Sequence, residues 1–393
     1  MNRGMTGAWE STAVAGEAVR AFVPRPLPPA PPLAFDLPLQ RQQEQALVAL
    51  GRLDAIGELL PDPQLFFYHY IRREAVLSSQ IEGTQSSLSD LLLREAAPAP
   101  GFGDVRETSL AVDALEHGLQ RLRGGFPLCN RLLCEMHGRL MARRRDLSKR
   151  PGEFRRSQNW IGGTRPGNAR FVPPPPQAVA DCMAALERFL HDQSTPVLTK
   201  AALAHVQFET IHPFLDGNGR IGRLLITLLL HHERLLREPL LYLSLFFKRN
   251  RQHYYHLLSE VRQTGNWESW LAFFLTGVHE VATEAVDKAQ RLTQLFESDR
   301  ARINALGARA AASALAVHRQ FCHHPYAAIK TLAAQTGLAF LTVQRSIERL
   351  EKLQIIRETT GRRRHRIFAY PTYLQILNQD TDRPGEEGYP AAP

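Results

Sequence analysis

Apolar residues recur at helical spacing along most of the chain, and this pattern predicts a mainly α-helical fold. One predicted helical face near residue 50 carries the side chains of Leu47, Leu50, Leu53, Ile56, Leu59 and Leu60. Similar runs recur near residues 66–95, 105–122 and 128–142. Residues 267–296 form a longer amphipathic run, which we expect to be a helix that leads out of the core.

The two ends of the chain lack this periodicity. Residues 1–20 read as weakly ordered, and residues 374–393 read as a disordered tail. Residues 24–38 are proline-rich, which predicts an extended segment that could bind a proline-reading module. We favour packing of this segment across the domain, because it carries apolar side chains at Leu27, Leu33, Phe35 and Leu37.

Residues 305–373 form a second module. A helix near residues 329–336 is followed by Gly337 and by a new helix that begins near Thr342, with Val343, Ile347, Leu350 and Leu353 on its apolar face. Two short strands are expected at residues 355–358 and 366–370, joined through Gly361 and the basic residues 362–364. This order resembles a winged helix-turn-helix domain, a fold that binds DNA or serves as a docking or dimerisation unit.

Charge does not decide between those two roles. The net charge of +9 and the basic residues Arg345, Arg349 and Lys352 on the second helix suit contact with DNA phosphates. Glu348 and Glu351 interrupt the same helix, and charged runs are usually solvated faces. DNA and a homodimer therefore both stay open as partners.

Length and composition set the class of protein. With 393 residues, 44% of them hydrophobic, the chain is long enough for about two to three domains with sizeable cores. The apolar stretch at residues 224–230 is far shorter than the ~20 residues that span a bilayer. No secretory signal follows Arg3, so we expect a cytoplasmic protein that does not enter a membrane.

Cysteines and paired histidines do not predict a metal centre. The four cysteines, at positions 129, 134, 182 and 322, form no Cys-x-x-Cys arrangement and are expected to be reduced. The pairs His231-His232 and His323-His324 have no carboxylate or cysteine at ligand spacing, so we do not expect zinc.

Residues 212–223, His-Pro-Phe-Leu-Asp-Gly-Asn-Gly-Arg-Ile-Gly-Arg, gather most of the candidate chemistry. His212 ends an apolar helical run, and Pro213 forces the chain out of that helix. The turn 216–219 has two glycines that allow backbone N–H groups to converge on an anion, and a new apolar helical run follows it at once. A helix N-terminus behind a glycine turn is suited to phosphate binding.

The charged residues of this run agree with a phosphate site. Arg220 and Arg223 leave the same face near the positive end of the new helix, where their charges are unfavourable unless an anion binds. Asp216 could hold Mg²⁺ against the same phosphates. His212 could accept a hydroxyl proton near neutral pH. Phe214 is expected to be a core residue that fixes the loop, and the alternative for the whole run is a simple helix connector.

The run is similar to the signature of the Fic family, His-Pro-Phe-x-Asp/Glu-Gly-Asn-Gly-Arg-x-x-Arg, at every defined position. The resemblance implies that His212 is the base, that Asp216 binds Mg²⁺ and that Arg223 orients the γ-phosphate of ATP. It makes the nucleotide-binding residues of the loop Gly217, Asn218, Gly219, Arg220, Ile221, Gly222 and Arg223. Members with this pattern commonly transfer AMP from ATP to a Tyr, Ser or Thr hydroxyl of a protein, whereas a phosphorylating side group carries Lys in place of Gly219.

The resemblance extends over residues 20–280. Residues 157–163 and 169–176 resemble the hairpin flap over the family's active site, with Gly162-Gly163 as the turn; an ordinary surface hairpin is the alternative. The flap's open edge could align a target segment by adding it as a strand. Residues 250–255 resemble the segment around the nucleoside, which implies that Asn250 and Tyr254 lie near the adenine or ribose; packing is the alternative for the tyrosines.

Residues 78–83, Ser-Ser-Gln-Ile-Glu-Gly, resemble the family's inhibitory helix. The resemblance implies that Glu82, supported by Ser78, pairs with Arg223 and removes the partner of the γ-phosphate. Such a charge-assisted contact contributes ~1.5 to 3 kcal/mol, enough to slow turnover roughly tenfold or more. A helix end closed by Gly83 is the alternative.

We therefore expect a Fic helical core with a small β-hairpin flap and a C-terminal winged helix. The predicted divisions are residues 1–38 (arm), 39–125 (helical region with the inhibitory helix), 126–282 (catalytic core), 283–304 (connecting helix), 305–373 (winged helix) and 374–393 (tail). The favoured function is an autoinhibited protein adenylyltransferase that uses ATP and Mg²⁺ and acts on target hydroxyls, its own among them. A DNA-binding nucleotide sensor and an enzyme that removes AMP stay open as alternatives.

Overall fold

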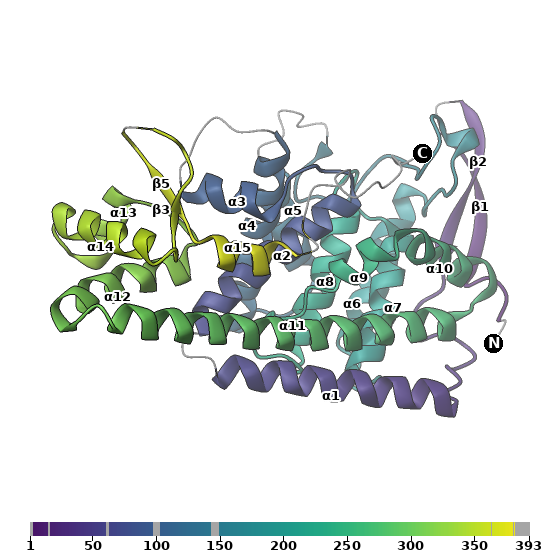
Figure 1. The fold of residues 1–393 in the computed structure, drawn as a ribbon. Helices are drawn as coiled ribbons and strands as arrows, with labels where there is room; N and C mark the ends of the chain where they lie inside the picture. The colour runs from purple at the N-terminus through teal and green to yellow at the C-terminus, as the bar shows by residue number, and fades with distance from the viewer. Residues whose placement is uncertain are drawn as a thin grey trace.

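A single long helix, α11 (Trp267–Asn304), runs along most of the molecule and joins its two parts (Figure 1). It begins where the side chain of Asn266 accepts a hydrogen bond from the backbone N–H of Ser269, a regular N-cap. The computed structural model describes residues 3–14, 16–59, 63–96, 103–142, 149–362, 364–379 and 381, and over these the fold is mainly helical, as predicted. The predicted divisions at residues 282 and 283 fall inside this one continuous helix.

The larger part is a helical core that surrounds two buried helices, α7 (Val197–Ile211) and α8 (Asn218–His232). All residues of α7 from Leu198 to Ile211 are buried, as expected of a helix packed on every side. The surrounding helices are α1 (Leu37–Leu59), α2 (Pro63–Ile81), α3 (Leu88–Ala96), α4 (Gly103–Arg123), α5 (Asn130–Leu140), α6 (Pro176–Leu190), α9 (Ser244–Arg249) and α10 (Arg251–Thr264). The apolar run near 66–95 is thus two helices, separated at Gly83, which has a φ of +100°.

The prediction that residues 1–20 are weakly ordered was wrong. Strands β1 (Gly7–Val14) and β2 (Glu17–Pro24) form an antiparallel hairpin in which Gly7 pairs with Pro24 and Val14 with Glu17. One face of the hairpin packs on the flap region, because Trp9 and Phe22 both make ring contacts with Phe171. β1 has three consecutive polar residues at positions 10–12, so its sequence shows neither a helical nor a strand period.

The proline-rich segment packs on the core, as predicted. Leu27, Leu33 and Phe35 are partly buried against the main hydrophobic cluster, although Leu37 is 59% exposed. The backbone N–H of Ala34 donates a hydrogen bond to Glu268 of α11, 2.8 Å away. The segment therefore lies across the core next to the start of the long helix.

The smaller part lies at the far end of α11 (Figure 1). It contains α12 (Ala308–His323), β3 (Tyr326–Ala328), α13 (Ile329–Thr336), α14 (Phe340–Lys352), β4 (Arg357–Glu358), β5 (Ile367–Ala369) and α15 (Pro371–Asn378). The strands form one antiparallel sheet in the order β3-β5-β4. Gly337, with a φ of +68°, makes the turn between α13 and α14 at the predicted position.

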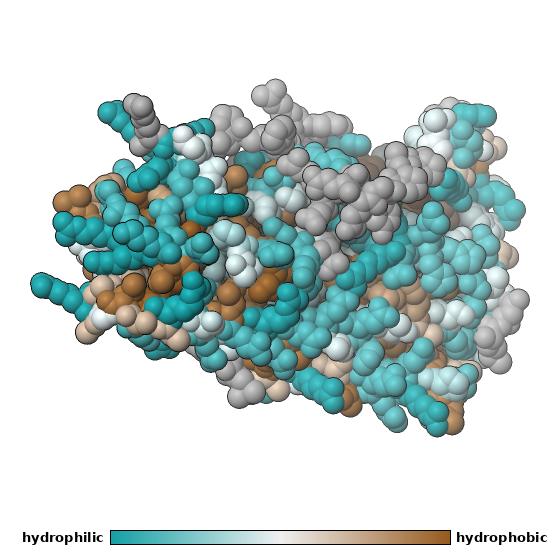
Figure 2. Space-filling view, in the orientation of Figure 1, coloured by the Kyte–Doolittle hydropathy of each residue, from teal (hydrophilic) through white to brown (hydrophobic). Residues whose placement is uncertain are grey.

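The surface of this end carries apolar side chains among the hydrophilic ones that cover most of the visible face (Figure 2). Phe340 and Leu341, in the first turn of α14, are 52% and 65% exposed. None of the helices described here is both long and apolar enough to cross a bilayer.

α15 and the residues that the structure describes after it, up to Thr381, return to the core and contact α2. Residues 374–378, expected in a disordered tail, belong to α15, while residues 380 and 382–393 lie outside the described part of the chain. The side chain of Arg73 donates a hydrogen bond to the carbonyl of Leu377, and that of Gln80 to the carbonyl of Thr381. For residues 374–378 the tail prediction was wrong, because α15 buries Tyr373, Leu374, Ile376 and Leu377.

Candidate functional site

The turn that links α7 to α8 is held together by its own side chains. His212 ends α7 in the left-handed conformation, with φ 49° and ψ 59°. The Asn218 amide stabilises the turn, since its Oδ1 accepts from the N–H of Phe214 and its Nδ2 donates to the Phe214 carbonyl, both at 2.8 Å. Asn218 is 1% exposed, and both of these hydrogen bonds use its side chain to shape the turn.

His137 of α5 also supports this turn, through contacts with Phe214 and Asp216. Its ring stacks on Phe214, with the ring centroids 3.8 Å apart. The N–H of Gly152 donates to Nδ1 at 2.9 Å, which leaves the proton on Nε2 to donate to the Asp216 carbonyl at 3.1 Å. Burial lowers the pKa of His137 to about 4, so this neutral tautomer persists at neutral pH. The sequence reasoning missed His137, which carries no local motif.

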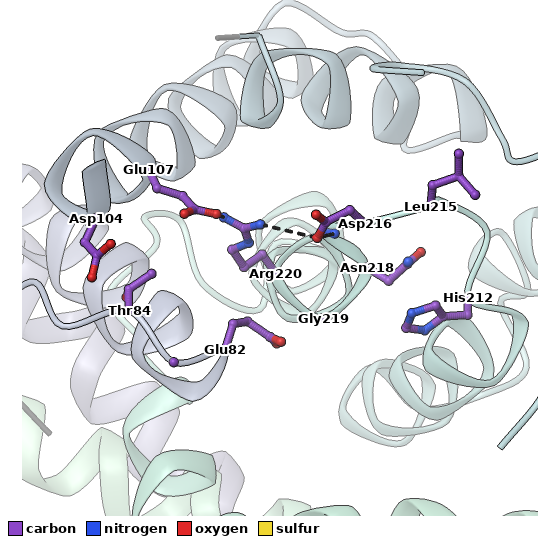
Figure 3. A pocket seen from close by; sticks show the side chains of 12 residues that line it. Glu82, Thr84, Asp104, Glu107, His212, Leu215, Asp216, Asn218, Gly219 and Arg220 are labelled. Carbon is purple, nitrogen blue, oxygen red and sulfur yellow. Dashed lines mark hydrogen bonds and ion pairs between the residues drawn. The ribbon is translucent and has the colours of Figure 1, made fainter. Parts of the chain in front are cut away.

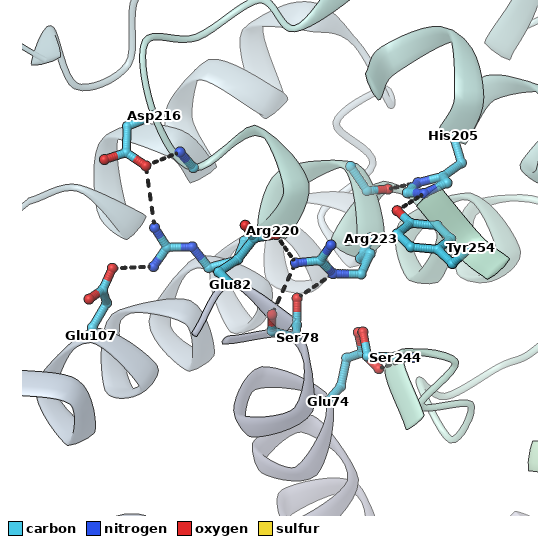
Figure 4. Close-up of polar contacts among 12 residues, drawn as sticks. Glu74, Ser78, Glu82, Glu107, His205, Asp216, Arg220, Arg223, Ser244 and Tyr254 are labelled. Atoms are coloured by element: carbon cyan, nitrogen blue, oxygen red, sulfur yellow. Dashed lines mark hydrogen bonds and ion pairs between the residues drawn. The ribbon is translucent and has the colours of Figure 1, made fainter. Parts of the chain in front are cut away.

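Arg220 and Arg223 both project from the first two turns of α8 and bind different partners (Figure 4). Arg220 is 4% exposed. It donates to Glu107 of α4 at 2.7 Å and has Asp216 Oδ1 within 3.9 Å. Glu107 was not predicted, because nothing in α4 marks this carboxylate as a partner of the turn. The ion pair with Glu107 holds the Arg220 guanidinium beside the turn at residues 216–219.

Arg223 is bound by the end of α2. Its Nη2 donates to Glu82 Oε1 at 2.6 Å and to the Ser78 carbonyl at 3.0 Å, and its Nε donates to Ser78 Oγ at 2.9 Å. The Arg223 side chain is 2% exposed, whereas that of Glu82 is 38% exposed. Both predicted residues of α2 therefore contact the predicted arginine.

Glu82 and Arg223 each stabilise the charged form of the other. Burial alone raises the pKa of Glu82, but the Arg223 guanidinium outweighs burial and holds the pKa below its ordinary value of 4.5. Burial opposes the charge of Arg223, yet Glu82 and neighbouring groups raise the pKa of Arg223 well above its usual range. The ion pair is therefore charged throughout the neutral range.

His212 is a neutral imidazole at neutral pH. Its pKa is lowered to about 4, chiefly by burial and next by Arg155, while Glu82 partly opposes both. This value lies below the ~6.5 of an unperturbed histidine, which the sequence reasoning assumed. A neutral imidazole can accept a proton, so the protonation state suits a general base.

Two cavities meet at this turn. The smaller, of about 380 Å³, is lined by Asp104, Glu107, Asp216, Asn218 and Arg220 among others, with Glu82 and His212 facing it from opposite sides (Figure 3). The larger, of about 1180 Å³, extends from His212 to α10. Glu82, His212 and Gly219 line both cavities, so Glu82 stands where one opens into the other.

The predicted flap borders the larger cavity through Ile161, Gly162 and Phe171. It forms one isolated bridge between Ile161 and Phe171, with a short 3₁₀ turn at Pro166–Asn168, and not two full strands. The N-terminal hairpin supports it, because the N–H of Phe22 donates to the Val172 carbonyl at 2.9 Å. The first segment of the flap therefore borders the cavity at Ile161, while the second segment is paired with the N-terminal hairpin through Val172.

Of the two residues predicted near the nucleoside, only Asn250 lines the larger cavity. Tyr254 is fully buried, and its hydroxyl lies 2.8 Å from His205 Nε2, an arrangement that agrees with the packing alternative. Tyr255 lines the cavity instead. One helical position separates the two tyrosines by about 100° around α10, a difference that a resemblance in sequence did not resolve.

Glu209, one turn before His212, is a further buried acid at this cavity. Its Oε1 has no hydrogen-bond partner within the described parts of the chain, and burial raises its pKa to about 7. The nearby Arg223 opposes this rise. The sequence reasoning missed Glu209 because it lies inside a helix that reads as purely apolar.

Oxygen ligands for a cation are few here. Across the residues that the structure covers, no cluster of three or more His, Cys, Asp and Glu side chains is placed to hold a metal ion. Asp216 presents a carboxylate to the smaller cavity beside Arg220. A single carboxylate suits Mg²⁺, which takes one or two protein oxygens and completes its shell with phosphate oxygens and water.

Comparison with known proteins agrees with this geometry. Residues 127–230 match the Fic/DOC family, and residues 40–120 match the Fic/DOC family N-terminal region. The resemblance of the signature to the Fic family is therefore confirmed for the part of the chain that contains the site.

Named relatives match over a limited region. The chain is 42% identical over 110 residues to the protein adenylyltransferase Fic of Drosophila ananassae, which is 27% of this chain and 20% of that protein. It is 35% identical over 114 residues to a protein named probable protein adenylyltransferase of Aquifex aeolicus, which is 29% of this chain and 32% of that protein. The chain thus spans a third or less of the length of these relatives.

A solved structure shares the fold over nearly the whole chain. A Fic family protein from Desulfovibrio desulfuricans superposes with a TM-score of 0.57 at 20% identity, covering 87% of this chain and 98% of that chain. Because the identity is low, this likeness bears on the fold alone.

Proposed function

We propose that this protein is an adenylyltransferase that transfers AMP from ATP to a hydroxyl group of a target protein, with Glu82 as its inhibitor. The observation that carries the proposal is the convergence of a neutral His212 imidazole, the N-terminus of α8 and two buried arginines on adjoining cavities. The named relatives are protein adenylyltransferases, which agrees with this chemistry.

The reaction joins a protein oxygen to the α-phosphorus of ATP. His212 would accept the proton of the Tyr, Ser or Thr hydroxyl, and the oxygen would attack the α-phosphorus as the bond to the β-phosphate oxygen breaks. Pyrophosphate leaves and the protein keeps AMP. The backbone N–H groups of α8 from Asn218 onward, together with Arg220, would hold the phosphate charge that this step redistributes.

Mg²⁺ would be held by Asp216 together with oxygens of the bound phosphates, and would neutralise part of their charge. Asp216 is kept in position by the contact between its carbonyl and His137.

The proposed inhibition acts through Arg223. In the structure this guanidinium is occupied by Glu82 and Ser78, so it cannot also bind the γ-phosphate. The Glu82 carboxylate would in addition repel a triphosphate at the junction of the two cavities. ATP would then bind in a pose unsuited to in-line attack.

The test is intact-mass spectrometry after incubation with ATP and Mg²⁺. We expect AMP to be added to the Glu82→Gly protein, little to be added to the wild type, and none to the double variant Glu82→Gly/His212→Ala. A Glu82→Gly protein that neither modifies itself nor transfers labelled AMP to any protein of a cell extract would contradict the proposal.

DNA is a second candidate partner, through the C-terminal module. We infer this from its exposed cations: Arg345 on α14 and Arg362 and Arg364 in the loop between β4 and β5 are all exposed. Their arrangement suits a winged helix that places α14 in the major groove and the loop along the backbone. This contact would locate the enzyme without entering its chemistry.

A further inference from the structure

Arg155 is a buried arginine that binds backbone oxygens and no carboxylate within the described parts of the chain. It is 2% exposed, among the largest fully buried side chains of the molecule. Its Nε donates to the His212 carbonyl at 2.9 Å, and its Nη2 donates to the carbonyls of Pro174 at 2.6 Å and Ile211 at 3.3 Å. Buried arginines are normally paired with an acid, so an unpaired one indicates a specific use.

The placement of Arg155 gives it three simultaneous connections to the site. Its guanidinium donates to the carbonyl of Ile211, in the last turn of α7, and to the carbonyl of His212. Its own N–H donates to the Pro213 carbonyl at 2.8 Å, directly after that residue. Through Pro174 it also ties the end of the flap segment to the same point.

The backbone of His212 needs such support. Its φ of 49° lies in the left-handed region, which is unfavourable for residues with a side chain. Carbonyls on both sides of this bend point toward Arg155 or its backbone, and the planar guanidinium can satisfy two of them in a fixed geometry. Lysine, with a compact ammonium group, cannot reproduce this fork.

The charge of Arg155 also acts on the imidazole. Burial and Arg155 are the two largest influences that lower the pKa of His212, Arg262 adds to them, and Glu82 opposes them together with the backbone of Glu209. In the Glu82→Gly enzyme the opposing carboxylate is absent. The positive charge of Arg155 would then weigh more heavily on the protonation of His212.

We propose that Arg155 is a positioning residue for the general base: it holds His212 in its left-handed bend and disfavours the protonated imidazole. The proposal rests on the adenylyltransferase function. It assigns a role to a residue that lies 57 positions from His212 in the sequence and contacts no substrate.

The experiment compares Arg155→Gln and Arg155→Lys in the Glu82→Gly background, with initial rates of AMP transfer measured from about pH 3.5 to 8, a range that includes the acidic limb expected near the lowered pKa of His212. The neighbouring Arg156 provides the matched control, since its side chain is 73% exposed and Arg156→Gln removes the same charge from the surface. Activity of the Glu82→Gly parent tests the adenylyltransferase function separately.

For Arg155→Gln we expect kcat to fall at least tenfold with little change in the KM for ATP, and the acidic limb of the rate profile to rise by roughly one pH unit. Arg155→Lys should keep the limb of the parent while kcat stays low, because it retains the charge but not the fork. Arg156→Gln should match the parent in both respects.

A second readout does not depend on turnover. The His212 resonances, identified by their loss in His212→Ala, are followed by NMR during a pH titration of each variant. An Arg155→Gln protein that remains folded and titrates His212 as the parent does, with an unchanged acidic limb, would overturn the proposal and leave Arg155 a purely structural residue.

Discussion

The carboxylate of Glu82 lies directly against the Cα of Gly219, so closely that a Cβ at position 219 would overlap Glu82 Oε1. Glu82 therefore reaches across from the end of α2 and covers the first turn of α8, the part of that helix whose free N–H groups attract phosphate. Its proposed inhibition combines two effects at one point, since the carboxylate binds Arg223 and also fills space beside the anion site.

Inhibition by Glu82 is expected to be independent of pH near neutrality. Because Arg223 depresses the pKa of Glu82, the ion pair is complete above pH 4.5 and is lost only as the pH falls through the lowered value. The ratio of the AMP-transfer rates of Glu82→Gly and wild type, expected to be roughly tenfold or more, should stay constant from pH 6 to 9. A ratio that falls steadily toward one as the pH is lowered from 9 to 6 would contradict this prediction.

The two adjacent tyrosines of α10 should separate binding from stability. Tyr255→Ala removes a side chain that lines the larger cavity, so the KM for ATP in the Glu82→Gly enzyme should rise severalfold. Tyr254→Phe removes only the buried hydroxyl that is hydrogen-bonded to His205. The free energy of unfolding should therefore fall by about 1 kcal/mol, while the KM for ATP stays unchanged.

Steady-state kinetics and thermal melting distinguish these outcomes. If Tyr254→Phe raised the KM and Tyr255→Ala did not, the assignment of the two side chains to core and cavity would be wrong.

Residues 212–223 could be predicted because their chemistry is local. Adjacent glycines, a helix start and two arginines three positions apart bring these groups together whatever the rest of the fold does. Glu82 and Ser78 could be placed only through resemblance, since α2 and α8 meet in space over a separation of 141 residues. Arg155, His137 and Glu107 act over comparable distances without any motif, and sequence reasoning had no means to find them.

The N-terminal hairpin illustrates a second limit. Its two strands show no regular alternation of polar and apolar residues, and the hairpin packs against Phe171 far along the chain. Asn218 illustrates a third limit of prediction from the sequence. The signature predicted its position correctly, yet its side chain holds the turn through Phe214, so only its backbone N–H remains for phosphate.

If the C-terminal module binds DNA, single substitutions of its exposed cations should weaken binding in a salt-dependent way. Arg345→Ala and Arg364→Ala should each reduce the affinity for a mixed-sequence duplex and lower the slope of log K against log salt by about 1. Arg319→Ala is the control, because this exposed arginine lies on α12, beside a cavity between α11 and α12, and belongs to neither α14 nor the loop between β4 and β5. Fluorescence anisotropy at several salt concentrations measures both quantities, and equal affinities for all four proteins would exclude these residues from a DNA contact.

Residues 377, 379 and 381 contact α2 through their backbone carbonyls. Gln80 lies two residues before Glu82, and its Nε2 donates to the carbonyls of Ser86 at 2.9 Å and Thr381 at 3.1 Å. Thr381 is fully buried, and Arg73, about two turns before Gln80 on α2, binds the carbonyls of Leu377 and Gln379 in the same segment. The position of Glu82 is therefore linked to the segment that follows α15, so loosening the segment should loosen Glu82.

Gln80→Ala removes the amide that connects the two. We expect it to raise AMP transfer severalfold in the otherwise wild-type chain and to have no further effect in the Glu82→Gly background, because its influence would pass through Glu82. Gln85→Ala is the matched control, since the Gln85 side chain is exposed and, among the residues that the structure describes, hydrogen-bonds only to the nearby Gly83 carbonyl. The measurement is the initial rate of AMP incorporation for all four combinations. An equal factor in both backgrounds would show that Gln80 acts on the catalytic core directly, and an unchanged rate in the wild-type chain would show that the C-terminal segment does not restrain Glu82.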